Sequence, residues 1–102
     1  MATLEELTDR IRRAASSGEG LSRTVKLDLK GEGFIHVDGA SVTNDDLPAD
    51  LVVRVSRADL VRLGKGELDP MRAVMTGRMK LSDIGLAMKL TPQIQALFER
   101  AV

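Results

Sequence analysis

The sequence predicts an α+β domain in which a mainly antiparallel sheet is covered by helices on one face. The hydrophobic period is helical at the N-terminus, changes to two from Ser22 onward, and is helical again in most of the second half. The early strand-like segments are grouped and hairpin-linked, which favours antiparallel pairing. At 102 residues the chain fits a single domain, residues 1–102, and it shows no internal repeat or linker.

An amphipathic helix is predicted at the N-terminus. Thr3-Leu4-Glu5-Glu6 has the form of a capping box, and Ser16-Ser17-Gly18 is expected to end the helix. Its apolar stripe consists of Leu4, Leu7, Ile11 and Ala14 or Ala15.

A hairpin follows, with strands over residues 25–30 and 34–38. A slip of one residue would turn every side chain of a strand to the opposite face, so the loop length decides the pairing. We predict an odd loop, Gly31-Glu32-Gly33, that pairs Leu29 with Ile35 and Leu27 with Val37 on the apolar face. Lys26 is then opposite Asp38, and Asp28 is opposite His36, on the outer face.

Two more strands and a helix are predicted in the middle of the chain. A short strand near residues 40–43 and a turn at Asn44-Asp45-Asp46 precede a strand over residues 51–55, where apolar residues alternate. Ser56 is placed to cap a helix that stops at Gly64.

The last part of the chain alternates helix and strand. Asp69-Pro70 begins a helix that Gly77 closes, and residues 78–81 alternate as a final strand. Ser82 is expected to cap a short helix to about Lys89, and Thr91-Pro92 to begin a separate final helix.

Composition and charge exclude several classes of function. Fifteen basic residues balance fifteen acidic ones, so the chain lacks the long-range positive field that attracts nucleic acid or an anionic membrane. The chain has no cysteine and no apolar run of membrane-spanning length, and its acidic N-terminus does not resemble a signal peptide. We expect a cytoplasmic protein with no nucleic-acid partner and no membrane insertion.

Four motifs stand out along the chain. One is Gly77-Arg78-Met79-Lys80-Leu81 followed by Gly85-Leu86-Ala87-Met88-Lys89-Leu90. The others are Asp28-Leu29-Lys30-Gly31-Glu32-Gly33, Ala49-Asp50, and Gly64-Lys65-Gly66-Glu67-Leu68-Asp69-Pro70-Met71-Arg72-Ala73. In order and spacing these motifs resemble the sterol carrier protein family, a lipid-transfer domain that stands alone in bacteria, and the first is the strongest match. The resemblance implies a five-stranded sheet, an apolar tunnel for fatty acyl chains, acyl-CoA or sterols, and no catalytic residue.

The predicted ligand site is an adaptable apolar wall in the second half of the chain. Four of the five methionines lie between residues 64 and 90, and flexible thioether side chains adapt to varied guests. The same spacing would also result if these methionines were ordinary residues of the hydrophobic core. The residues assigned to the wall are Met71, Val74, Met75, Met79, Leu81, Leu86, Met88, Leu90, Ile94, Leu97 and Phe98.

Charged residues offer weaker candidates for a site. Lys65, Arg72, Arg78 and Lys80 could hold a carboxylate or phosphate head group, although solvated surface charges give the same pattern. His36, the single histidine, is expected to face outward, and no metal site or catalytic triad accompanies it.

The leading hypothesis is therefore a non-enzymatic carrier of an apolar lipid, without a cofactor. The alternative is an accessory module that uses the same apolar surface to dock a lipid- or quinone-pathway enzyme, or to form a homodimer. An enzyme would rest only on His36 and scattered carboxylates.

Overall fold

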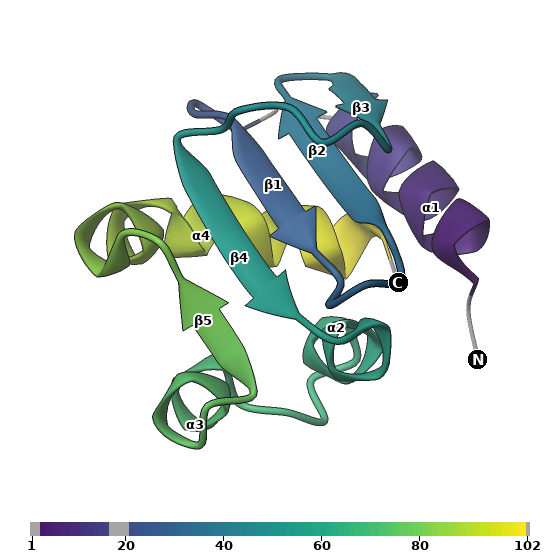
Figure 1. The fold of residues 1–102 in the computed structure, drawn as a ribbon. Coiled ribbons are helices and arrows are strands. Elements are labelled where there is room, and N and C mark those ends of the chain that lie inside the picture. Colours follow the sequence, from purple (N-terminus) through teal and green to yellow (C-terminus); the bar gives the residue numbers. More distant parts are fainter. Residues whose placement is uncertain (1–2, 17–20, 102) are drawn as a thin grey trace.

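The computed structural model describes residues 3–16 and 21–101, the last four of them as backbone only, and shows a five-stranded sheet with four helices (Figure 1). The predicted helix-ending residues Ser17 and Gly18 lie outside the described residues. In chain order the elements are α1 (Leu4–Ser16), β1 (Val25–Asp28), β2 (Phe34–Asp38), β3 (Ser41–Thr43), β4 (Leu51–Val55), α2 (Arg57–Gly64), α3 (Pro70–Met75), β5 (Met79–Leu81) and α4 (Ile84–Ala101).

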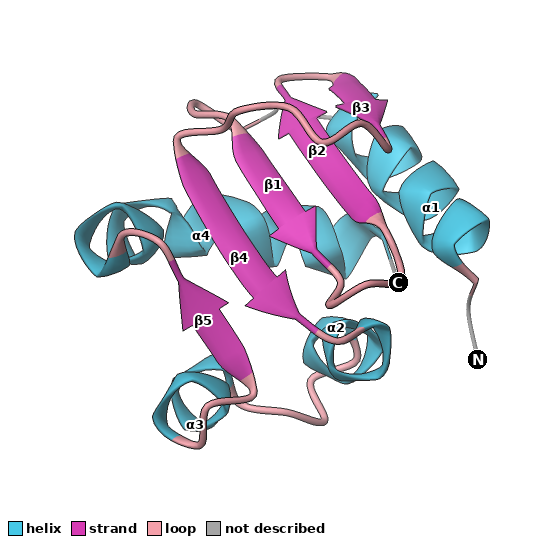
Figure 2. Ribbon diagram, in the orientation of Figure 1, coloured by secondary structure: helices cyan, strands magenta, loops and turns pink. Residues whose placement is uncertain are grey.

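The sheet is mixed, with strand order β3-β2-β1-β4-β5 (Figure 2). Three pairings are antiparallel, as predicted, but the central β1–β4 pairing is parallel and places Leu27 beside Val53. Thr43, the last residue of β3, is level with Lys26 near the start of β1, and Leu51, the first residue of β4, is level with Val25. The pair is parallel because residues 44–50 cross from one side of β1 to the other without reversing along it. Local sequence patterns contain no signal for that crossing.

The hairpin between β1 and β2 has an odd number of loop residues, as predicted, but the predicted residue pairs are not the ones that form. Leu27 pairs with Ile35 and Val25 with Val37, so apolar residues do face apolar residues. The pairs Leu29–Ile35 and Leu27–Val37 were wrong by two residues, and Lys26, rather than Asp28, is opposite His36. Strand β1 stops at Asp28 because its carboxylate accepts a hydrogen bond from the Lys30 amide at 3.0 Å and turns the chain.

The segment between β3 and β4 covers part of the sheet's outer face. His36 is buried beneath it, and its Nε2 lies 3.1 Å from the carbonyl oxygen of Pro48. Lys26 reaches Asp46 in the same segment and lies over the Phe34 ring, 5.4 Å from the centroid. His36 lies on the outer face of the sheet, as predicted, but it is not exposed there. The alternation of β2 could not reveal that another segment shields this face.

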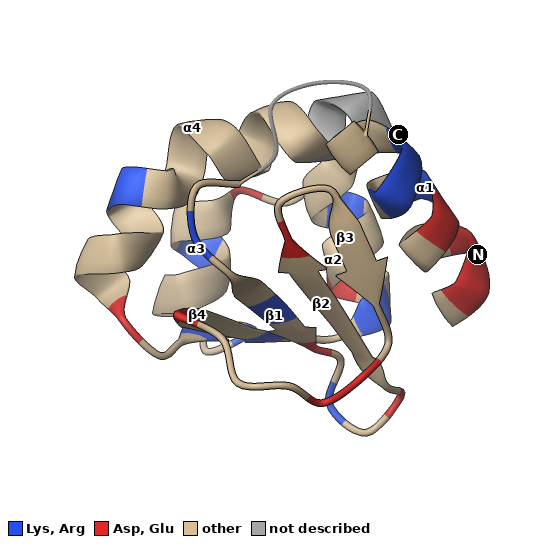
Figure 3. Cartoon of the chain, turned by 90° about the horizontal axis from the view of Figure 1, so that it is seen from above, with Lys and Arg blue, Asp and Glu red and all other residues tan. Residues whose placement is uncertain are grey.

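Helices α1 and α4 pack on the opposite face of the sheet (Figure 3). Thr3 Oγ1 accepts a hydrogen bond from the Glu6 amide at 3.2 Å, which confirms the predicted start of α1. The core between α1, α4 and the sheet is filled mainly by Leu, Val, Ile and Ala; its least exposed large members are Leu29, Ile35, Leu51, Val37 and Val55.

Helices α2 and α3 lie at the end of the sheet where β4 ends and β5 begins (Figure 1). Their predicted caps are confirmed. Ser56 accepts a hydrogen bond from the Asp59 amide at 3.1 Å, and Asp69 accepts one from the Met71 amide at 3.2 Å. Gly77 follows α3 with φ of 77°, a conformation that favours glycine.

The two predicted C-terminal helices are one helix, α4, with Pro92 in its interior. The predicted cap was also wrong by one residue. Asp83 accepts the hydrogen bond from the Leu86 amide at 3.0 Å, whereas the Ser82 hydroxyl accepts one from the Val52 amide at 2.9 Å. Proline is tolerated there although it cannot donate to the carbonyl of Met88, because helical packing on both sides of it holds Leu90 and Leu97 in the core.

Candidate functional site

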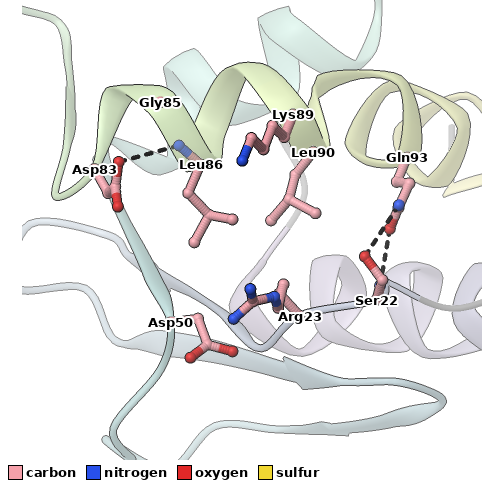
Figure 4. Close-up of a pocket in the computed structure, with 9 residues that line it drawn as sticks. All are labelled: Ser22, Arg23, Asp50, Asp83, Gly85, Leu86, Lys89, Leu90 and Gln93. Carbon is pink, nitrogen blue, oxygen red and sulfur yellow. Dashed lines mark hydrogen bonds between the residues drawn. The ribbon is translucent and has the colours of Figure 1, made fainter.

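A pocket of about 600 Å³ lies between α4 and the segments that lead into β1 and β4 (Figure 4). The first half of α4 forms one wall, and the chain just before β1 and β4 forms the other. Residues far apart in the sequence therefore meet in it. The lining residues are Ser22, Arg23, Asp50, Asp83, Gly85, Leu86, Lys89, Leu90 and Gln93.

Hydrogen bonds between distant segments hold the pocket in shape. The Ser22 amide donates to Gln93 Oε1 at 2.8 Å, and Gln93 Nε2 donates to the Ser22 hydroxyl at 3.1 Å. At the starts of β1 and β4, Asp50 Oδ2 accepts hydrogen bonds from the Thr24 amide at 3.2 Å and from its hydroxyl at 3.1 Å. These contacts join both sides of the pocket to the sheet.

The apolar part of the pocket comes from α4. Leu86 and Leu90 are one turn apart, and their side chains point from the helix into the space above Arg23 and Asp50 (Figure 4). Leu90 is buried and belongs to the core, while Leu86 is half-buried and packs against it. The pocket thus touches the hydrophobic core directly.

The charged groups of the pocket differ in how they are bonded. Asp50 accepts a hydrogen bond from the Thr24 amide, and Asp83 accepts one from the Leu86 amide. Within the described part of the chain, Arg23 and Lys89 form no ion pair, and no side-chain hydrogen bond is formed by either. The two cations are therefore available to the polar end of a ligand whose apolar part contacts Leu86 and Leu90.

The predicted wall residues do not come together in this pocket. Of them, only Leu86 and Leu90 line it. Met79 and Leu97 are buried in the core, and Val74, Leu81 and Ile94 are half-buried against it. Met71, Met75 and Met88 are exposed, and the side chain of Phe98 lies outside the described part of the structure.

The cations singled out in the sequence also lie elsewhere. Lys65, Arg72, Arg78 and Lys80 are not among the lining residues, and Arg78 lies 3.4 Å from Asp59. Ser22 and Gln93 were missed because their hydrogen bonds join positions 71 residues apart, and Arg23 was missed because it lies in the pocket only through its place beside Ser22. Asp50 and Lys89 do fall within motifs that carry the family resemblance, and these motifs were the sequence signal that could have pointed to both pocket residues.

The described residues contain no cluster of His, Cys, Asp and Glu able to hold a metal ion. His36 lies on β2 and is not a lining residue of the pocket. None of the helices in the described ranges has the length and apolar character that crossing a bilayer requires.

Sequence comparison then decides the family. A model of the SCP-2 sterol transfer family matches residues 2–95. The chain belongs to this family. A comparison with curated proteins finds no match.

Solved structures of sterol carrier proteins share the fold. Sterol Carrier Protein 2 Like 2 of Aedes aegypti aligns with a TM-score of 0.72 at 22% identity, covering 85% of this chain and 92% of the mosquito protein. Sterol Carrier Protein 2 of the same species, in complex with palmitate, aligns with a TM-score of 0.69 at 16% identity over 90% of this chain and 94% of its own. At these identities the likeness to solved structures concerns the fold.

Proposed function

We propose that this sterol carrier family member binds and transfers an apolar lipid, such as a fatty acid, acyl-CoA or sterol-like molecule, without catalysing a reaction. The observation that carries the proposal is the pocket in which Leu86 and Leu90 continue the hydrophobic core to the surface. Its volume of about 600 Å³ lies within the ~300–1,000 Å³ common for small-molecule sites. The palmitate complex of a structurally similar sterol carrier protein supports the ligand class.

The ligand lies with its chain along Leu86 and Leu90 and its polar end among the charged residues of the rim. An apolar chain gains from covering leucine side chains, because each buried CH₂ contributes ~0.8 kcal/mol. Arg23 and Lys89 can then approach a carboxylate or phosphate at the rim. The predicted wall residues that are buried in the core, Met79 and Leu97, contact the chain only if the core opens.

Native mass spectrometry of gently purified protein tests the carrier directly. A bound mass that organic extraction removes supports it. In a titration with palmitate, Leu86→Ala is expected to weaken binding about tenfold, which corresponds to ~1.4 kcal/mol for the lost apolar contact. The matched control is Leu47→Ala, because Leu47 is an exposed leucine outside the pocket.

Two results would count against the proposal. If fatty acids, acyl-CoA and sterols all fail to bind at high micromolar concentration, the carrier hypothesis is to be abandoned. The alternative, an accessory module that docks a partner enzyme or a second copy of the chain, then takes its place. If Leu86→Ala and Leu47→Ala leave palmitate binding equally unchanged, the ligand lies elsewhere in the protein.

A further inference from the structure

Strand β5 forms one edge of the sheet, and its single strand neighbour is β4 (Figure 2). Directly opposed residues of an antiparallel pair alternate between pairs that exchange backbone hydrogen bonds and pairs that do not. The Ser82 amide donates to the Val52 carbonyl oxygen at 3.0 Å. The Arg54–Lys80 pair lies two residues further along the same register, so it is also of the hydrogen-bonded kind.

The backbone groups of Met79 and Leu81 therefore point away from β4, toward the open edge of the sheet. In the described part of the chain, neither residue forms a backbone hydrogen bond with a segment outside the sheet. Each offers one donor and one acceptor, and such an edge is a template for a further strand. Met79 is buried in the core and Leu81 is half-buried against it, so apolar residues of an added strand would extend the inner face.

The outer face at this edge is positively charged. Lys80 lies directly beside Arg54, and both are exposed. Neither forms an ion pair among the described residues. Arg78 precedes β5, and its carbonyl oxygen accepts a hydrogen bond from Lys30 Nζ at 3.2 Å, which brings a further ammonium group to the start of the strand.

Two carboxylates of the same region are already engaged. Asp28 is level with Arg54 in the sheet but accepts a hydrogen bond from the Lys30 amide at 3.0 Å. Asp59 is shared by two guanidinium groups, those of Arg78 at 3.4 Å and Arg62 at 3.6 Å. Cations at the edge are therefore left to pair with a negatively charged partner.

We propose that β5 binds an extended acidic segment of a partner protein as an additional antiparallel strand. The partner residue opposite Lys80 stands in a pair without hydrogen bonds, where side chains approach most closely, so glutamate or aspartate is favoured there. The residues opposite Met79 and Leu81 form the hydrogen-bonded pairs and continue the apolar face. The segment is thus expected to alternate apolar and acidic residues.

Charge also argues against a second copy of the chain as the occupant. Two β5 strands paired antiparallel about their centres would place Lys80 directly opposite Lys80 of the other copy, and like charges in that position repel. A lysine on an edge strand is a common means of preventing such self-association. The same side chain that excludes a second copy attracts an acidic strand.

This interaction goes beyond the proposed lipid binding and does not depend on it. The two sites are close in the chain, because Asp83, which lines the pocket, follows the end of β5 at Leu81 by two residues. A partner bound along β5 therefore lies near the candidate lipid site.

A blocked peptide of sequence Thr-Val-Glu-Val-Glu-Val-Thr is the probe, titrated into the protein and followed by NMR. Amide signals of β5 are expected to shift, and the Met79 and Leu81 amides to become protected from hydrogen exchange. Replacing both glutamates of the peptide by lysine should abolish binding. N-methylation of the central valine, whose amide faces β5, should weaken binding about tenfold, whereas N-methylation of a glutamate, whose amide faces away, should change it little.

Variants of the protein test the charge. Lys80→Gln is expected to weaken binding of the glutamate peptide about threefold, and Lys80→Glu about tenfold while creating affinity for the lysine peptide. Arg13→Gln is the control, because Arg13 is an exposed cation on α1, which packs beside β3 at the opposite edge. Since Lys80 and Arg13 are exposed, each variant should keep its unfolding midpoint, which circular dichroism checks.

Four outcomes overturn the proposal. They are the absence of glutamate-peptide binding at high micromolar concentration, equal effects of the two N-methylations, equal effects of Lys80→Gln and Arg13→Gln, and sedimentation showing a dimer of the unmodified chain that pairs through β5. Palmitate binding is measured without the peptide, so failure of strand addition and failure of lipid binding are distinguishable.

Discussion

Gln93 and Ser22 form a two-way hydrogen-bonded pair that joins α4 to the start of β1. The Ser22 amide donates to Gln93 Oε1 at 2.8 Å, and Gln93 Nε2 donates to Ser22 Oγ at 3.1 Å. The two residues are 71 positions apart, and both line the pocket. The pair therefore sets the distance between the two walls of the candidate site.

Removing this pair should loosen the pocket. Gln93→Ala is expected to lower the free energy of unfolding by about 1 kcal/mol and to weaken palmitate binding several-fold, because two hydrogen bonds near the surface are lost. Chemical denaturation and a palmitate titration measure the two effects. Gln95→Ala is the matched control, since Gln95 is an exposed glutamine on the same helix outside the pocket. Equal effects of the two substitutions would contradict the role given to Gln93.

His36 should stabilise the segment that crosses the outer face of the sheet. His36→Ala is expected to lower the free energy of unfolding by about 1–3 kcal/mol, because it empties a buried site and leaves the Pro48 carbonyl without its partner. Hydrogen exchange should rise in residues 44–50. Asp38→Ala, at an exposed position of the same strand, is the control. An unchanged exchange rate in the covering segment would show that His36 does not hold it.

Asp83, and not Ser82, should determine where α4 begins. Asp83→Ala is expected to cost about 1 kcal/mol of stability through loss of the N-cap bond to the Leu86 amide. Asp45→Ala removes an exposed aspartate that forms no side-chain hydrogen bond in the described residues, and should have little effect. Thermal denaturation compares the two; a larger loss in Asp45→Ala would refute the assignment.

Pro92 should be a net cost to the stability of α4. Pro92→Ala restores an amide that can donate to the Met88 carbonyl, so the free energy of unfolding is expected to rise by about 1–2 kcal/mol. The gain is smaller than the ~3 kcal/mol of an interior proline because alanine also leaves the unfolded chain freer. Urea denaturation measures it. A loss of stability would mean that the helix is fitted to the bend that proline imposes.

The sequence by itself determined most of the elements and the family. Thr3, Ser56 and Asp69 cap helices as predicted, and apolar residues of β1 face apolar residues of β2. Such features depend on residues a few positions apart, where capping and side-chain period act locally. The motifs around Gly77 and Gly85 carried the resemblance that the match over residues 2–95 confirms.

Tertiary structure alone decided the parallel β1–β4 pairing, the burial of His36, the continuity of α4 through Pro92 and the composition of the pocket. Each depends on contacts between residues distant in sequence, and the free energy of those contacts overrides local preference. A proline that favours a helix boundary is held within a helix when core packing on both sides outweighs one lost hydrogen bond. The methionines show the same limit: their spacing fitted a ligand wall, but packing left Met71, Met75 and Met88 at the surface.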